Sequence, residues 1–335
     1  MCPKSSGGWS KMMSACMRSP VSARLWKNIS WQSFRKEGRM VGLDLFRAEW
    51  TKITGHRWVV GCLIWIFPIA AFLLLVLMAV ILALVDSART EFASQSYLWT
   101  EQMIGVWSVP RDIFGRLLLV GFTAVMFAGE YQWGTWKNTV PRHNRVALIT
   151  VKFATLGVLV LVTFVIMSII LGLGVGVLTM ISGADYGPRI TTDVLADFAG
   201  DYLLQMALAF TATLILAGYA ALAAMLTRSI LGGILIGLGL SFLEGLIPVG
   251  LFLIALFLDF PTVLHLSRIF PAYNLANISE WIINGKALET TIPFRDGEQI
   301  IYSDSLGFSL AMTTLWVVLL VGLTIYFFRR QDITS

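Results

Sequence analysis

The most distinctive side chains of this sequence lie in a short basic and aromatic segment between Gly129 and Lys152. From Gly129 to Arg145 it reads Gly-Glu-Tyr-Gln-Trp-Gly-Thr-Trp-Lys-Asn-Thr-Val-Pro-Arg-His-Asn-Arg. Exposed aromatic side chains beside basic ones are typical of a protein docking surface. The alternative is anchoring at the membrane interface, because Trp and Tyr favour the headgroup layer. In both cases these residues predict binding rather than catalysis.

Two charged residues lie inside apolar stretches, where charge is costly. Glu244 falls more than halfway along a long apolar segment, and Arg116 lies at the outer end of another. An acid in the middle of a span costs roughly 2.5–3.5 kcal/mol on insertion scales. Glu244 therefore requires compensation, and Arg116 is the candidate partner. The two residues form either a structural ion pair or the polar lining of an outer gate.

Motifs for catalysis and nucleotide binding are missing from the sequence. It contains no Gly-x-x-x-x-Gly-Lys-[Ser/Thr] phosphate loop, no His-Glu-x-x-His and no Gly-x-Ser-x-Gly. The three histidines are far apart in the chain, and the three cysteines lack the spacing of a disulfide framework or metal site. We predict that the chain is not an enzyme and has no cofactor or metal, so that energy for transport comes from elsewhere.

The composition places these residues in a membrane protein. The chain has 335 residues, of which 57% are hydrophobic and 13% charged, against about 25% charged in soluble proteins. So few charges cannot cover a soluble surface. The net charge of +5 has an explanation in topology, given below, and does not indicate nucleic-acid binding. We predict an all-α polytopic membrane protein.

Six apolar segments are long enough to cross a bilayer, which takes about 20 residues. Their approximate bounds are Trp58–Val85, Ile104–Ala128, Leu148–Met180, Tyr202–Leu226, Ile230–Ile247 and Leu306–Phe328. The fifth is interrupted by Glu244, Gly245 and Pro248. We predict that Val249–Leu258 re-enters the outer leaflet without crossing. A seventh crossing is the rival interpretation and would place the C-terminus outside.

The distribution of basic residues sets the orientation. Lys and Arg concentrate in the tail before residue 58, in the 130–152 segment, at Arg228 and at the end of the last span, whereas acids gather in the other loops. The positive-inside rule therefore puts both termini and the 130–147 loop in the cytoplasm of a plasma-membrane protein, and residues 259–305 outside. Within this outer segment, Thr290–Tyr302 predicts a small β-hairpin.

The N-terminal region divides at Met40. Beyond it, Leu43, Phe46, Trp50 and Ile53 share one helical face, which predicts an amphipathic helix in the inner headgroup layer. Residues 1–39 are basic and rich in Ser. They are either a disordered arm at the membrane surface or outside the natural protein, which would then start at Met40. Residues 40–330 form the predicted six-span permease domain.

The loop after the second span carries a family resemblance. Glu130, Gly134 and Thr135, the Pro141-to-Arg145 end and Lys152 resemble the corresponding loop of permease subunits of type-2 ATP-binding-cassette exporters. The resemblance covers residues 40–330. In that family the loop helix couples the permease to a separate ATPase subunit, and two permeases pair to form the pathway.

The resemblance implies several expectations for this chain. Glu130, Gly134, Thr135, Pro141 and Arg145 would form the ATPase-coupling loop. The partners would be a cytoplasmic ATPase subunit, a second permease copy or a related permease, and the lipid bilayer. Glu244 matches the acid common in the fifth span of the family, and the outer segments Val249–Leu258 and Leu264–Trp281 match its short re-entrant helices.

Two other function classes remain open. A secondary, ion-coupled transporter usually has several intramembrane charges and paired broken helices, whereas this sequence has one deep acid and one interrupted span. A membrane-bound enzyme or a scaffold would need polar groups that converge within the spans. Apolar span faces suit a lipid, a peptide or a drug equally, so the sequence leaves the cargo open.

Overall fold

A computed structural model describes residues 42–55, 57–140, 144–293 and 299–332. The N-terminal extension 1–39 and Pro141 fall outside these residues. The all-α polytopic fold is confirmed: six helices of the described chain are long and apolar enough to cross a membrane. They are α4 (Ile66–Leu84), α7 (Ile113–Gln132), α9 (Arg145–Ser182), α10 (Thr192–Thr227), α11 (Ile230–Leu258) and α13 (Leu306–Arg330).

Shorter elements connect these helices. They are a helix over residues 42–55, α3 (Arg57–Leu63), α5 (Asp86–Ala93), β1 (Ser96–Leu98), α6 (Trp99–Gly105), the 3₁₀ helix η1 (Val106–Arg111), α8 (Trp136–Thr139), β2 (Asp185–Gly187), the 3₁₀ helix η3 (Pro261–Ile269), α12 (Pro271–Asn284), β3 (Thr290–Pro293) and β4 (Gln299–Tyr302). Strands β1 and β2 pair in parallel and tie the end of α5 to the end of α9.

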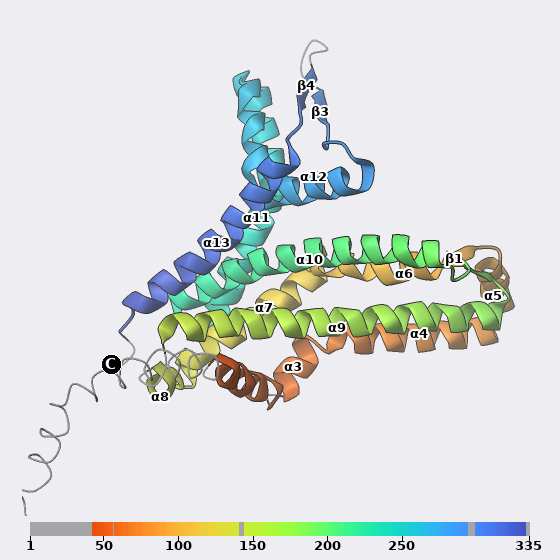
Figure 1. Ribbon diagram of the computed structural model, residues 1–335, viewed down its shortest axis with the longest axis horizontal. Helices are drawn as coiled ribbons and strands as arrows, with labels where there is room; N and C mark the ends of the chain where they lie inside the picture. The colour runs from red at the N-terminus through yellow and green to blue at the C-terminus, as the bar shows by residue number, and fades with distance from the viewer. Residues whose placement is uncertain (1–41, 56, 141–143, 294–298, 333–335) are drawn as a thin grey trace, which may run out of the picture.

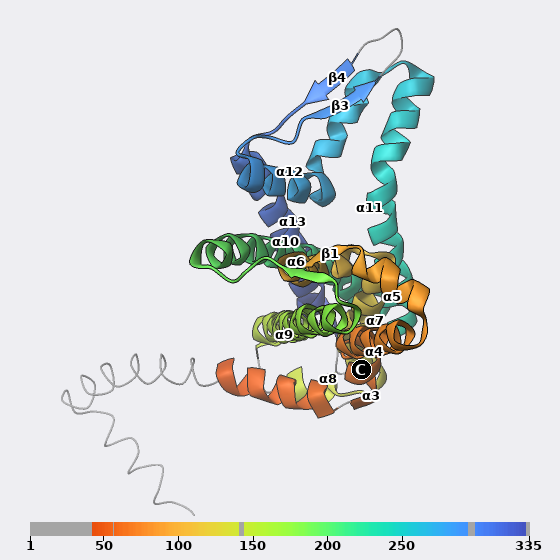
Figure 2. The same ribbon diagram turned by 90° about the vertical axis from the view of Figure 1, so that its right-hand side faces the viewer.

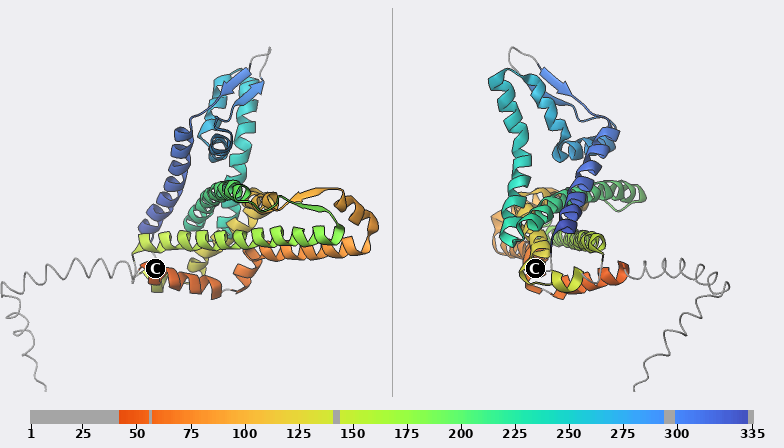
Figure 3. Two further views of the ribbon diagram at one scale, coloured as in Figure 1. Left: turned by 45° about the vertical axis from the view of Figure 1, so that its right-hand side comes forward. Right: turned by 90° about the vertical axis from the view of Figure 1, so that its left-hand side faces the viewer.

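The helices form two groups that share one end and separate at the other (Figure 1). In the first group α4, α6, α9 and α10 lie alongside one another, and their far end carries α5 and the β1–β2 pair. In the second, α11 and α13 diverge from α10 and carry α12 and the β3–β4 hairpin at their far end (Figures 2 and 3). The helix over residues 42–55, α8 and the C-terminal end of α13 gather at the shared end.

The buried core lies where the two groups meet. Helices α7 and α10 are the most buried of the six, whereas α4 and α11 expose most of their apolar side chains. Gly233 and Gly237 of α11 lie against α10 in this core. An added Cβ at Gly237 would stand 2.9 Å from the Cα of Ala220, and one at Gly233 would stand 3.0 Å from the Cβ of Ala224. Small residues thus let α10 and α11 approach closely.

Three predicted boundaries were wrong. The first long helix, α4, begins at Ile66 rather than at Trp58, because a turn at residues 64–65 separates it from α3. The second begins at Ile113 rather than Ile104, because Pro110 ends η1 and the chain is extended at Asp112. The predicted re-entrant segment Val249–Leu258 continues α11 without a break. Pro248 is tolerated there, as proline often is in packed membrane helices.

The segment between α11 and α13 folds back from the tip of α11 through η3 and α12 (Figure 2). The predicted hairpin is confirmed, with Thr290 opposite Tyr302. Asp304 fixes this segment to the start of α13: its backbone oxygen accepts from Asn277 at 3.0 Å and from Trp281 at 2.9 Å. Its carboxylate accepts from Arg268 Nε at 2.8 Å. This hydrogen bond holds the pKa of Asp304 below its usual range.

Candidate functional site

The helix over residues 42–55 lies against the shared end of the bundle through one face. Leu45 and Ile53 on this face are buried, and Glu49 and Lys52 point the same way at helical spacing. Of the predicted apolar face, Leu43 is 58% exposed. Leu43 can therefore contact the headgroup layer. The face of the helix that packs against the bundle includes the charged residues Glu49 and Lys52.

The charges of this face meet two charges of the spans. Lys152 Nζ lies 2.8 Å from Glu130 Oε1 and also pairs with Glu49, and Lys52 pairs with Glu130. Lys152 further donates to the backbone oxygen of Met126 at 3.2 Å. We call Glu49, Lys52, Glu130 and Lys152 the ion cluster. It joins the helix over residues 42–55 to the end of α7 and the start of α9.

The ion cluster is electrically balanced and mostly buried. Glu130 and Lys152 are each only 3% exposed, so each would be costly without its partner. Two acids and two bases leave no net charge. Burial lowers the pKa of Lys52 to about 8, and the nearby charge of Lys152 acts in the same direction. Lys52 is the outer base of the cluster, because its side chain is 32% exposed and that of Lys152 only 4%.

The loop after α7 is built on this cluster. Gly134 has φ +66°, a backbone conformation that costs glycine little. The resulting turn brings the Thr135 hydroxyl onto Glu130 Oε2, to which it donates. Helix α8 follows, and its first residue, Trp136, is 1% exposed. The Trp136 ring lies 4.5 Å from that of Phe328 near the end of α13.

Arg145, at the start of α9, holds the end of α13. Its Nη1 donates to the backbone oxygens of Phe328, Arg329 and Gln331 at 3.0, 2.9 and 2.8 Å. These carbonyls have no helical donor of their own, and a cation there complements the helix dipole. The amide of Gln331 also donates to the Met225 oxygen at 2.6 Å. The loop is therefore attached to α13 as well as to α7 and α9.

Comparison with known proteins fits this arrangement. A model of the family described as ABC-2 family transporter protein matches residues 45–244. The chain belongs to this family. No curated protein and no solved structure matched it. As an ABC-2 family transporter protein it is the multi-pass membrane component of an ATP-binding-cassette transporter. Membership of this family implies an ATP-binding-cassette partner.

The structure places the predicted loop residues of this ABC-2 protein in two contacts. Glu130 and Thr135 meet at the ion cluster, and Gly134 makes the turn between them. Arg145 lies on the α13 end instead, and Pro141 lies outside the described residues. Sequence reasoning gave Glu49 and Lys52 no role in the site. Their opposite charges one turn apart, together with Lys152 inside the third span, were the available signal.

The aromatic residues of the loop differ from the expected docking surface. Trp136 is buried, and Tyr131 is half-buried with its hydroxyl on Gln331. Trp133 is 49% exposed. Its ring covers Gly129, where an added Cβ would come within 2.8 Å of it. Most of this aromatic surface thus holds the loop onto the spans, and the exposed part is limited to Trp133.

The second predicted pair, Glu244 and Arg116, lines one cavity of about 160 Å³ between α7, α10, α11 and α12. The two side chains form no ion pair among the described residues. Glu244 accepts from the Tyr219 hydroxyl at 3.1 Å. Arg116 donates to the backbone and side-chain oxygens of Ser241 at 3.3 and 3.2 Å. Neighbours of each residue therefore compensate its charge separately, inside a shared polar cavity.

Proposed function

We propose that this chain is the permease subunit of an ATP-binding-cassette exporter, driven by a separate ATPase subunit that docks on the loop around α8. The observation that carries the proposal is the attachment of this loop at three places. Glu130 links it to α7 and Lys152, Thr135 closes it on Glu130, and Arg145 links its far end to α13. A push on α8 would move these helix ends together rather than bend a free loop.

A docking place for the ATPase lies next to α8. A cleft of about 280 Å³ is lined by Gly134, Lys137, Arg228 and Asp332, among others. It combines exposed backbone of the loop with two basic side chains, Lys137 and Arg228, and two acids, Glu130 and Asp332. Complementary charges around such a cleft would steer and orient an acidic surface of the partner.

The polar cavity of Arg116 and Glu244 would line the outer part of the pathway. Charged residues within spans commonly mark a substrate route, because a charge inside the bilayer is costly in free energy and is rarely found there without a function. Here α12 closes the cavity with Pro271 and Leu275. Motion of α12 with α13 would open it. A second permease copy, identical or related, would complete the pathway along the helices that expose apolar side chains.

The first test concerns nucleotide. Because the sequence contains no phosphate loop, the purified full-length chain should neither bind nor hydrolyse ATP. Equilibrium binding of a fluorescent ATP analogue to a homogeneous preparation measures this directly. Addition of the ATPase subunit that co-purifies from native membranes should restore hydrolysis. Saturable ATP binding by the chain alone would refute the proposal that a separate subunit binds and hydrolyses ATP.

The second test concerns orientation. The contacts of Glu130 with Lys52 and of Arg145 with the α13 end support a common side for the N-terminal helix, the loop and the C-terminal end. The abundance of basic residues favours the cytoplasm as that side. In a background without native cysteines, Lys137→Cys should resist an impermeant thiol reagent on intact cells, whereas Lys286→Cys should react. The reverse pattern would contradict the exporter topology.

A further inference from the structure

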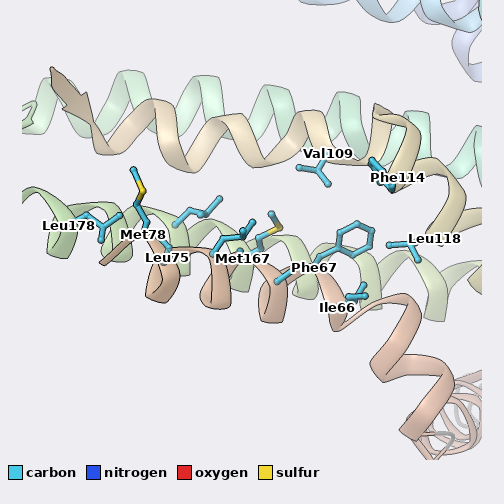
Figure 4. Close-up of a pocket in the computed structure, with 13 residues that line it drawn as sticks. Ile66, Phe67, Leu75, Met78, Val109, Phe114, Leu118, Met167 and Leu178 are labelled. Atoms are coloured by element: carbon cyan, nitrogen blue, oxygen red, sulfur yellow. The ribbon is translucent and has the colours of Figure 1, made fainter. Parts of the chain in front are cut away.

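Two cavities among the spans differ in the chemistry of their walls. A groove of about 470 Å³ between α4, α9 and the start of α7 is lined by apolar side chains throughout. Figure 4 shows Phe67 and Met78 on one side of this groove and Val109 on the other. Such a wall selects no particular apolar molecule, because lipid tails are as apolar as the wall itself. The cavity of Arg116 and Glu244 has polar side chains as well, so it can select a ligand by its chemical group.

Basic side chains outnumber acidic ones in this polar cavity. Arg111 and Arg116 both line it, and Glu244 is the single acid of its lining within the described chain. Asp112, next to Arg111 in the sequence, is not part of the lining, and α10 and α12 add no charged side chain to it. Two bases and one acid leave an excess of positive charge, which favours an anionic ligand.

The two arginines also have hydrogen-bond donors to spare. Arg116 is held in place, since its Nε donates to the backbone oxygen of Arg111 at 2.7 Å and its Nη1 donates to Ser241. Neither the Nη2 of Arg116 nor the guanidinium of Arg111 has an acceptor among the described residues. Glu244, by contrast, already accepts from the Tyr219 hydroxyl. The cavity therefore offers a ligand mainly donors, as an anion requires.

Two neighbouring guanidinium groups suit the oxygens of one phosphate. Arg111 ends η1 and Arg116 lies in the first turn of α7, and both line the same cavity. A guanidinium binds an oxyanion through several donors in a fixed fork. A phosphate group has three strong acceptor oxygens, so it can accept from both arginines at once. A carboxylate has fewer oxygens, and one arginine is enough to occupy them.

The remainder of the cavity is apolar and small. Ile215, Leu216 and Leu275 line it and are buried, whereas Ala272 and Ala276 of α12 line it and are exposed. The exposed positions leave the cavity accessible beside α12. Its volume of about 160 Å³ is below the roughly 300–1,000 Å³ typical of sites for drug-sized ligands. It therefore suits a compact anionic group with a short apolar stretch rather than a whole large molecule.

We propose that this cavity binds the phosphate group of an amphiphile, with the phosphate between Arg111 and Arg116 and the adjoining apolar chain along Ile215, Leu216 and Leu275. The inference rests on the proposed function, because it takes the cavity as part of the export pathway and names the chemical class of the cargo. Binding itself requires neither ATP nor the ATPase subunit.

The test measures binding of radiolabelled hexyl phosphate to the full-length chain in micelles of an uncharged maltoside detergent, with protein-free micelles as the blank. Wild type should bind saturably, with one hexyl phosphate per chain. Arg111→Gln should lower the affinity about tenfold or more, the usual effect of losing a charge-assisted hydrogen bond. Arg111 has no side-chain partner among the described residues, so this variant should fold normally. Equal affinity in wild type and Arg111→Gln would overturn the proposal.

Two further variants separate charge in the cavity from damage to the fold. Arg89→Gln, at an exposed arginine of α5, is the matched control and should keep the wild-type affinity. Glu244→Gln removes the acid of the lining and should raise the affinity for hexyl phosphate several-fold, which a damaged fold would not do. A loss of affinity in Arg89→Gln equal to that in Arg111→Gln, or a lower affinity in Glu244→Gln, would contradict the site.

Competition distinguishes the parts and the source of the ligand. Hexanol, which lacks phosphate, should not displace hexyl phosphate. Inorganic phosphate, which lacks a chain, should compete at least about tenfold more weakly than unlabelled hexyl phosphate. A short-chain lysophosphatidic acid should compete as well as hexyl phosphate, since it carries the same group on a lipid. Competition by inorganic phosphate as strong as that by hexyl phosphate would assign the cavity to free phosphate and overturn the amphiphile.

The same measurements keep this inference apart from the exporter assignment. A chain that binds no hexyl phosphate, in a complex that still transports another cargo on addition of ATP, would overturn only the cargo class. A chain that binds hexyl phosphate and also binds ATP without a partner would retain the phosphate site and overturn the exporter assignment.

Discussion

Lys152→Met should lower the free energy of unfolding of the purified chain by about 3–5 kcal/mol, the usual cost of removing one partner from a buried ion pair. The substitution leaves Glu49 and Glu130 with Lys52 alone, so one buried acid loses its base. Denaturant unfolding in detergent micelles measures the change. Lys137→Met, at an exposed lysine of α8, is the matched control and should change stability by less than about 0.5 kcal/mol.

The double variant Glu130→Leu, Lys152→Met provides the sharper comparison. It removes one acid and one base and leaves Glu49 beside Lys52, so it should be less destabilised than Lys152→Met alone. Replacing a whole buried pair with apolar residues is often neutral, whereas breaking it is not. Equal losses in Lys152→Met and Lys137→Met would mean that the ion cluster contributes nothing to the fold.

Arg145→Glu should uncouple the loop from α13 and lower ATP-driven activity of the isolated transporter complex at least tenfold. It removes three hydrogen bonds to backbone oxygens and puts an acid at the negative end of a helix. Even one hydrogen bond to a charged group is worth about 1.5–3 kcal/mol, and about 1.4 kcal/mol corresponds to a factor of ten. Spans that do not contact Arg145 should still fold, so membrane levels should stay normal.

The measurement compares ATP hydrolysis by the complex recovered from membranes through a tagged permease. Arg329→Glu is the control, because this arginine is exposed at the same end of α13 and its side chain has no hydrogen bond or ion pair with the described residues of the loop. Full activity in Arg145→Glu would show that α13 takes no part in coupling. Loss of the ATPase subunit from the complex would instead assign Arg145 to the subunit contact that the family resemblance implies.

Much of the fold was predictable from composition and the positions of the charges. Long apolar segments predict spans because a bilayer leaves the backbone few alternatives. Glu244, Gly245 and Pro248 predicted a helix break that is not there. The sequence contains the breaking residues, but the helices that pack against α11 decide whether the break occurs. At the start of the second span the cause is local, because Pro110 lies in η1 and the chain is extended at Asp112 before α7 begins.

The candidate site was only half predictable for a related reason. Glu130, Thr135 and Lys152 lie close enough in the sequence to be recognised as one loop and its flank. Glu49, Lys52 and Phe328 reach the same place from distant segments, and no periodicity links them to it. A charge on an amphipathic helix has the same pattern whether it faces water or a buried acid. Only the docked position of the helix distinguishes the two.

The length of α9 has a consequence for the membrane itself. Its 38 residues span about 57 Å at 1.5 Å per residue, nearly twice the hydrocarbon thickness of about 30 Å. Leu173 and Met180 in its outer half are 70% and 85% exposed, so an upright helix would leave apolar surface in water. Tilting or local bilayer thickening resolves such a mismatch. Bilayer thickness therefore affects the tilt of α9. Through Lys152 and Arg145, this tilt also affects the position of the loop at the inner end of α9.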